Sequence, residues 1–201
     1  MNILDVAEVI GIIAFALSGF LIAVEAKLDI LGIFIASFLT AFGGGATRDI
    51  IVGRELYAFS NNYASVLVIA VIMIAIYFKM QKLEDIEKHP LFVSADTLGM
   101  VSFAISGAMI GLESGISFFG VVLLSLITAV GGGVMRDILI NKVPLILVSE
   151  FYGSVALFVG MLIYGLGVLS WLNTFTIMIV FVLGICLRWL ALSRDWHLPK
   201  I

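Results

Sequence analysis

The chain has 201 residues, of which 62% are hydrophobic and 12% are charged, and its formal net charge is −3. A soluble domain carries about 25% charged residues, so this composition excludes a soluble globular enzyme. It also excludes a disordered chain, which needs low hydrophobicity and high net charge. The sequence has neither a basic block nor a Cys/His cluster, so we expect no nucleic-acid partner, no metal centre or other cofactor, and no enzyme.

Seven apolar segments approach the roughly 20 residues that a membrane-spanning helix requires. They are Val6–Val24, Ile30–Ile51, Tyr63–Phe78, Leu91–Leu112, Ile116–Ile140, Leu145–Val168 and Trp171–Leu192. The stretches between them are short and leave no room for a soluble domain. The sequence therefore predicts an all-α fold, in which residues 1–201 form one membrane domain with seven transmembrane helices in the lipid bilayer.

The distribution of basic residues predicts the orientation, because cytoplasmic loops are enriched in Lys and Arg. With seven spans, one side of the membrane has only Arg48 and Arg54. The other side has nine, namely Lys27, Lys79, Lys82, Lys88, Arg136, Lys142, Arg188, Arg194 and Lys200. This bias predicts an N-terminus outside the cell membrane and a cytoplasmic C-terminus. Arg188 falls within the last segment, close enough to its end to snorkel to the surface.

The two halves of the chain match at an offset of 88 residues. Residues 8–54 and 96–142 share 17 identities without a gap, including Gly-Gly-Gly-x-x-Arg-Asp in both halves. Each repeat, over about 5–80 and about 91–168, contains three predicted spans. Because that number is odd, the second copy is expected to insert upside down relative to the first, as in many transporters. The seventh segment, over about 171–192, has no partner.

Each half has three consecutive glycines inside its second segment, namely Gly43, Gly44 and Gly45 in the first half and Gly131, Gly132 and Gly133 in the second. Glycine lowers helix propensity by about 1 kcal/mol relative to alanine, so we expect a break in the helix at each triplet. A broken helix frees backbone carbonyls at its negative dipole end. The pattern predicts K+ or Na+ near the carbonyls of Gly43, Gly44, Gly131 and Gly132. The alternative is that the glycines only allow close helix packing.

A charged pair follows each triplet, Arg48-Asp49 in the first half and Arg136-Asp137 in the second. An arginine at this depth is costly, so it is expected to face a pore, a partner or a lipid phosphate, with the adjacent acid neutralising it. Either arginine could act as a gate in a cation path. The alternative is that both arginines mark helix ends at the membrane surface.

Hydroxyl side chains are also paired by the repeat: Ser18 with Ser106, and Thr40 with Thr128. They could line a pore, or each could bond to the backbone of its own helix. Two acids, Glu8 and Asp96, fall at the starts of their segments. We interpret them as acids that favour a helix N-terminus.

The duplicated Gly-Gly-Gly-x-x-Arg-Asp motif, within two three-span repeats and a seventh span, resembles the prokaryotic branch of the trimeric intracellular cation channel family, whose domain is also labelled as a glycine transporter. The resemblance implies a homotrimer with a pore in each protomer. It also implies kinks at Gly43–Gly45 and Gly131–Gly133 that constrict the pore, and conduction of monovalent cations, K+ above all.

The residues and the resemblance together predict a channel for K+ and also Na+. A second hypothesis is a secondary transporter for glycine or a similar small zwitterion, because broken helices can bind a carboxylate and an ammonium group. A third is a membrane scaffold without transport activity, which explains packing glycines but gives the Arg-Asp pairs no role.

Overall fold

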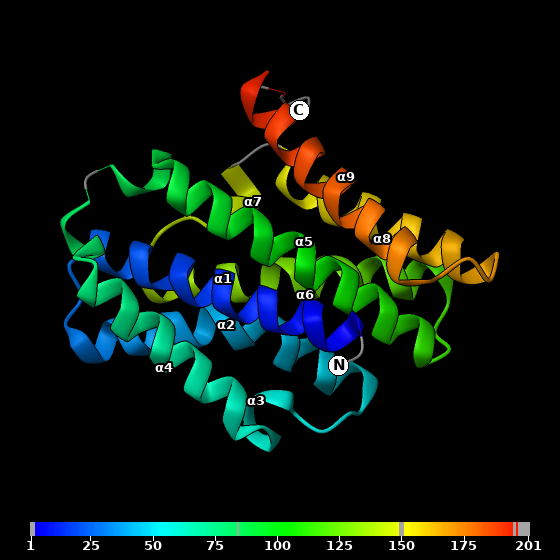
Figure 1. The fold of residues 1–201 in the computed structure, drawn as a ribbon, viewed down its shortest axis with the longest axis horizontal. Coiled ribbons are helices and arrows are strands. Elements are labelled where there is room, and N and C mark those ends of the chain that lie inside the picture. The colour runs from blue at the N-terminus through cyan, green and yellow to red at the C-terminus, as the bar shows by residue number, and fades with distance from the viewer. Residues whose placement is uncertain (1–2, 84, 149–150, 195, 197–201) are drawn as a thin grey trace.

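The computed structural model describes residues 3–83, 85–148, 151–194 and 196, and these residues form helices joined by short turns (Figure 1). The α-helices are α1 (Ile3–Glu25), α2 (Ile30–Val52), α3 (Tyr57–Ser60), α4 (Asn62–Tyr77), α5 (Pro90–Glu113), α6 (Phe118–Leu139), α7 (Leu145–Val148), α8 (Tyr152–Val168) and α9 (Thr174–Ser193). Two short 3-10 helices, η1 (Met80–Lys82) and η2 (Ile86–Lys88), lie between α4 and α5. The fold is all-α, as predicted.

The starts of α2 and α6 are fixed in the same way at positions 88 residues apart. The Asp29 carboxylate accepts a hydrogen bond from the Gly32 N–H at 2.7 Å, and the Ser117 hydroxyl accepts one from the Gly120 N–H at 3.3 Å. Such a cap satisfies an N–H group that has no partner within the helix. Gly53 ends α2 with a φ of 69°, in the left-handed region that glycine adopts readily.

Four long helices, α1, α2, α5 and α6, form the centre of the molecule. Figure 1 shows α1 and α5 side by side and running in opposite directions. On one side of this bundle, α4 packs mainly on α1; on the other side, α8 packs on α6 and α5, and α9 packs on α8 and α5. Phe15, Phe20 and Phe103 are among the largest buried side chains of the core. The residues predicted as functional sites all lie on the four central helices.

The surface and the helix lengths are those of a membrane protein. Five helices, α1, α2, α5, α6 and α9, are long and apolar enough to cross a bilayer, and α4 and α8 are apolar but shorter. Many large apolar side chains are exposed, including Ile30, Phe119 and Met178. A soluble monomer does not present so much apolar surface to water. The chain is therefore a multi-pass membrane protein.

The predicted span Leu145–Val168 is wrong as a single helix. The structure divides it into α7 and α8, and between them Phe151 has a φ of 61°, which a continuous right-handed helix does not contain. A second short helix, α3, precedes α4 in the first half and was also not predicted. Both short helices begin eight residues after the aspartate of an Arg-Asp pair.

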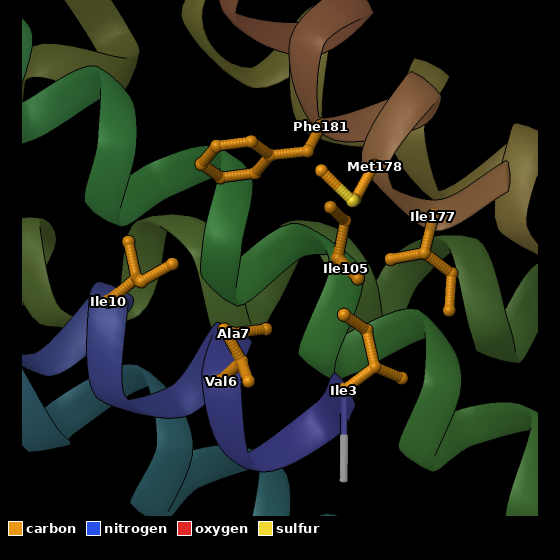
Figure 2. A pocket seen from close by; sticks show the side chains of 8 residues that line it. All are labelled: Ile3, Val6, Ala7, Ile10, Ile105, Ile177, Met178 and Phe181. Atoms are coloured by element: carbon orange, nitrogen blue, oxygen red, sulfur yellow. The ribbon is translucent and has the colours of Figure 1, made fainter. Parts of the chain in front are cut away.

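An apolar groove of about 220 Å³ lies between the start of α1, α5 and α9 (Figure 2). Ile10 lines it from α1, Ile105 from α5 and Phe181 from α9. Because every side chain that lines it is apolar, this face is suited to hydrocarbon rather than to water.

Candidate functional site: two arginine clusters and a glycine crossing

The two glycine triplets lie where α2 crosses α6, a contact that we call the glycine crossing (Gly43–Gly45 and Gly131–Gly133). A Cβ atom on Gly44 would overlap the carbonyl oxygen of Thr128, and a Cβ atom on Gly132 would overlap that of Thr40. A Cβ atom on Gly131 would lie only 3.0 Å from the Cα atom of Gly44. The two backbones are thus in direct contact, which the small size of glycine permits.

The prediction of broken helices at the triplets is wrong. Both α2 and α6 continue through their glycines, and the close contact between the helices, which was the alternative explanation, accounts for the glycines that face the partner helix. The cation site proposed near the carbonyls of these triplets stays a prediction. Continuous helices do not supply the freed carbonyls on which that prediction depended.

The first cluster, defined as Arg48, Asp49, Glu8 and Ser106, joins three central helices. The Arg48 guanidinium is 2% exposed; its Nη1 is ion-paired with the Glu8 carboxylate and donates to the Ser106 hydroxyl at 2.6 Å. Its Nε donates to the Asp49 carboxylate at 2.8 Å. The Ser106 hydroxyl is also hydrogen-bonded to Glu8. Thus α1, α2 and α5 each contribute a polar group to one buried network.

The second cluster, defined as Arg136, Asp137, Asp96 and Ser18, repeats this arrangement with the residues 88 positions away. Arg136 is fully buried; its Nε donates to Asp137 at 2.8 Å, and its Nη1 donates to the Ser18 hydroxyl at 2.8 Å. The Asp96 carboxylate lies 3.4 Å from the same Nη1 and accepts a hydrogen bond from Ser18 at 3.0 Å. Each cluster therefore combines an arginine from one half with a serine from the other.

Both arginines are buried inside the protein, close to the C-terminal ends of α2 and α6. Each is paired with the adjacent aspartate, as expected, and with a second acid that was not expected. Glu8 and Asp96 were interpreted as helix N-terminal acids, although their 88-residue spacing connects them to the same repeat as the arginines. Their matched positions were the signal that could have identified them as arginine partners.

The aspartates of the two clusters also hold the two short helices. The second carboxylate oxygen of Asp49 accepts a hydrogen bond from the Tyr57 N–H at 3.1 Å, and that of Asp137 accepts one from the Leu145 N–H at 2.9 Å. These N–H groups belong to the first residues of α3 and α7. An acid at this place satisfies a donor at a helix start, so each cluster fixes the chain that follows its long helix.

The predicted pore-lining threonines are bonded to their own helices. The Thr40 hydroxyl donates to the Ala36 carbonyl at 2.6 Å, and the Thr128 hydroxyl donates to the Leu124 carbonyl at 2.6 Å. This is the alternative that was considered for them. Ser18 and Ser106 instead belong to the two clusters, so the repeat groups the four hydroxyls into two different environments.

A hollow of about 100 Å³ opens beside the first cluster, and we call it the acidic hollow. Its charged lining residues are Asp5, Glu8, Arg48, Asp49, Arg54 and Glu55. Four acids against two arginines give its walls a net negative charge. A much smaller cavity shares Glu8, Arg48, Asp49 and Tyr57 with the hollow, and its lining on α2 runs from Asp49 back to Ala41. The structure thus contains an acid-lined hollow beside the first cluster and, next to it, a much smaller and mostly apolar cavity of about 10 Å³ that reaches the first glycine triplet.

Two further residues adjoin the second cluster and were not predicted as part of a site. Tyr152 on α8 is 3% exposed and lies near Asp96. The Arg188 guanidinium, on α9, lies 4.9 Å from the centre of the Tyr152 ring. The prediction that Arg188 snorkels to the surface is wrong, because it is 6% exposed and stacks inside the bundle.

The chain is similar to known membrane proteins along almost its whole length. A sequence model of the family described as "Glycine transporter" matches residues 5–81 and 93–167, two segments that start 88 residues apart. The chain is 37% identical to the UPF0126 membrane protein YvgT of Bacillus subtilis, over 98% of this chain and 95% of that protein.

The fold is also similar to solved structures of TRIC channels. One, determined as a structural basis for conductance through TRIC cation channels, is 33% identical and has a TM-score of 0.87 over 98% of this chain and 96% of that chain. A crystal structure of a prokaryotic TRIC channel in 0.5 M KCl is 29% identical, with a TM-score of 0.88 over 98% of both chains. These structural relatives are channels rather than enzymes. The chain therefore belongs to the trimeric intracellular cation (TRIC) channel family, whose domain also has the glycine-transporter description.

Proposed function

We propose that the protein is a channel for the monovalent cations K+ and Na+, and that it forms a homotrimer with a separate pore in each protomer. The observation that carries the proposal is the acidic hollow, because four acids from a single protomer line it beside the buried first cluster. Its net negative wall concentrates cations and repels anions. The relatives that are TRIC cation channels support the same function. The proposed conduction needs no cofactor.

The proposed path runs from the acidic hollow past the first cluster, through the glycine crossing and past the second cluster. The crossing is the proposed constriction, since the backbones of α2 and α6 are in direct contact there. Arg48 and Arg136 are the gate residues, with Asp49 and Asp137 as their counterions. An arginine that is ion-paired across the path repels a passing cation, so we assign this structure to a closed state.

The proposed topology has seven spans, with the first three inverted relative to the next three. The opposite directions of α1 and α5 support it (Figure 1). We place the chain in the cytoplasmic membrane with the N-terminus outside and the C-terminus in the cytoplasm. Without the buried Arg48, Arg136 and Arg188, the bias in basic residues that predicts this orientation remains seven to one.

The alternative is a secondary transporter for glycine or a similar zwitterion. The description of the matching family as a glycine transporter favours it. Buried carboxylates and arginines that alternate along one path could bind the ammonium and carboxylate groups of such a substrate. The transport rate of a single molecule distinguishes the channel from the transporter, because a carrier does not produce resolvable single-molecule currents.

The test is a planar bilayer recording under a KCl gradient with three proteins: the wild type, Gly44→Ala and Gly45→Ala. We expect discrete openings that reverse near the K+ equilibrium potential. Gly44→Ala is expected to alter or abolish them, and Gly45→Ala, whose Cβ atom meets only ordinary contacts, to preserve them. If the wild-type protein gives no current in the bilayer, and vesicles that contain it take up labelled glycine in a saturable way, the channel proposal is wrong and the transporter alternative is supported.

A further inference from the structure

Two apolar grooves lie along the contact between α1 and α5, and the repeat relates one to the other. The first is the groove of about 220 Å³ in Figure 2. The second has a volume of about 270 Å³, and we call it the open groove. On α1 the first groove is lined by Ile3, Val6, Ala7 and Ile10, and their matches on α5, 88 positions later, all line the open groove. Leu17 in the open groove likewise matches Ile105 in the first.

The two grooves differ in what covers them. Ile177, Met178 and Phe181 of α9 line the first groove, and Figure 2 shows them opposite the side chains of α1. The described residues that line the open groove come from α1 and α5. One of them, Ile13, is 40% exposed. The contact between α1 and α5 thus has a groove that α9 covers and a matched groove that faces the surroundings of the protomer.

The position and length of the open groove suit a single hydrocarbon chain. It runs along α5 from Leu91, next to the start of the helix, as far as Leu98. At about 1.5 Å per residue this is about 10 Å, which is less than the roughly 15 Å of hydrocarbon in one leaflet of a bilayer. The groove therefore begins near one membrane surface and ends inside the same leaflet, as a lipid acyl chain does.

We infer that the open groove binds one acyl chain of a membrane lipid, which takes the place that the side chains of α9 have in the first groove. Its lining is almost entirely apolar, so burial of hydrocarbon in it is favourable. The matched groove supplies the template, since the aliphatic and aromatic side chains of Met178 and Phe181 fill the same surface of the other half. This inference goes beyond the proposed function and holds for a channel and for a transporter.

Each groove lies behind one of the arginine clusters. Ala95 and Leu17 line the open groove and directly precede Asp96 and Ser18 of the second cluster. The matched residues of the first groove directly precede their counterparts in the first cluster. The bound acyl chain thus packs on the parts of α1 and α5 that hold the second cluster, where α9 packs on those that hold the first.

The test is photolabelling in vesicles of phosphatidylcholine that include a small fraction of phosphatidylcholine with a diazirine group in the middle of one acyl chain. Mass spectrometry of the illuminated protein measures the label on each segment. We expect segments 10–17 and 91–98 to have several times more label per residue than the exposed face of α4. That face, at Val66, Ile69 and Met73, is the reference for lipid that surrounds the protein without a specific site.

Two substitutions that add the same ring provide the matched comparison. Ala14→Phe places the ring in the open groove and is expected to reduce the label there to the level of the α4 face. Val66→Phe adds it to the exposed face of α4 and should leave the label in the groove unchanged. If Ala14→Phe does not fold, Ser94→Phe fills the groove from a half-buried position and is expected to give the same reduction.

Equal labelling of the groove and the α4 face in the wild type would overturn the inference. Weak labelling of the groove, combined with a disulfide between two copies of a Leu98→Cys, Cys186→Ser protein, would show that a second copy covers the groove and would overturn it as well. Photolabelling requires no current, so neither result affects the proposed channel. Strong labelling of the groove in a protein that passes no current but takes up glycine would overturn the channel and leave the acyl-chain site in place.

Discussion

The three glycines of each triplet have different neighbours although they are adjacent in sequence. The middle glycine faces a backbone carbonyl of the other long helix, at a distance that excludes any Cβ atom. The third glycine faces the guanidinium of the arginine one turn later, and a Cβ atom there would lie 3.7 Å from Arg48 Nη2 or 3.8 Å from Arg136 Nη2. The triplet therefore combines a helix contact with space beside the arginine.

This difference predicts opposite effects of two adjacent substitutions. Gly44→Ala is expected to lower the free energy of unfolding by about 3 kcal/mol or more, because the overlap is with a backbone that cannot rotate away. Gly45→Ala should leave it unchanged or raise it by up to about 1 kcal/mol through helix propensity. Thermal unfolding of the purified protein in detergent measures both. Equal effects of the two changes would contradict the backbone contact at Gly44.

The buried and exposed arginines provide a second contrast. Arg48→Gln leaves Glu8 and Asp49 as buried acids without their cation, so it is expected to cost about 3–5 kcal/mol. Arg54→Gln breaks an exposed pair with Glu113, at 3.4 Å, and should cost less than about 1 kcal/mol. Denaturation midpoints of the two variants under the same conditions compare them. If Arg54→Gln lowers the free energy of unfolding as much as Arg48→Gln does, this ranking of the two variants is wrong.

At the residue scale, the repeat predicted which residues matter but not how they are used. The arginines, aspartates and serines were selected from the 88-residue offset, and the structure brings all of them into the two clusters. Glu8 and Asp96 were missed because an acid near a helix start has a sufficient local explanation. Arg188 was missed as a cluster neighbour because no repeat relates it to anything.

The turns between the first two helices of each half differ in backbone strain. Lys27 has a φ of 57°, and the residue 88 positions later is Gly115, with a φ of 67°. A side chain in the left-handed region costs roughly 1–2 kcal/mol, whereas glycine adopts it readily.

We therefore expect Lys27→Gly to raise the free energy of unfolding by about 1 kcal/mol, after the loss of chain entropy that glycine brings. Lys27→Ala is the matched control, because it removes the same charge but keeps the strained conformation. Melting temperatures of the two variants give the comparison. If Lys27→Ala stabilises as much as Lys27→Gly, the charge and not the backbone is responsible.

At the element scale, hydropathy located the long helices to within a few residues of the observed ends. For example, the predicted segment Ile30–Ile51 corresponds to α2 over Ile30–Val52. The same property failed between α7 and α8, because Phe151 is as apolar as its neighbours and its left-handed conformation leaves no mark in the hydropathy. Helix propensity failed at the glycine triplets, where it predicted a break in each helix. Tertiary contact between α2 and α6 accounts for the continuous helices there.

At the scale of the whole molecule, two ion pairs between described residues join the halves: Lys142 pairs with Glu25, and Arg54 pairs with Glu113. Lys142 lies 3.2 Å from Glu25 and 2.6 Å from Glu87. Partial burial lowers the pKa of Lys142, but its hydrogen bonds and attraction to Glu87 and Glu25 outweigh this and leave the pKa above its ordinary value of 10.5. A raised lysine pKa means that folding favours the charged form.

The contribution of Lys142 to stability should therefore be complete below pH 10.5 and be lost as the pH rises through the raised value. Lys142→Arg, which stays charged over this range, is expected to resist the alkaline loss better than the wild type. Unfolding followed as a function of pH gives the result. Parallel alkaline curves for the two proteins would contradict the assignment.

The contacts between the halves are reciprocal. Arg48 bonds to Ser106, and Arg136 bonds to Ser18; Gly44 meets Thr128, and Gly132 meets Thr40. If each residue of the second half is renumbered as its match in the first half, 88 positions earlier, the two contacts of each pair join the same two positions. That relation defines the interface of a two-fold symmetric dimer.

Each half is thus chemically incomplete alone, since its arginine depends on a serine that only the other half supplies. A chain divided after Leu83 should reassemble in the membrane from fragments 1–83 and 84–201, and copurification through a tag on one fragment measures this. Either fragment expressed alone is expected to be degraded or to pair with a second copy of itself. In this sense the protomer is a dimer whose two subunits share one peptide chain.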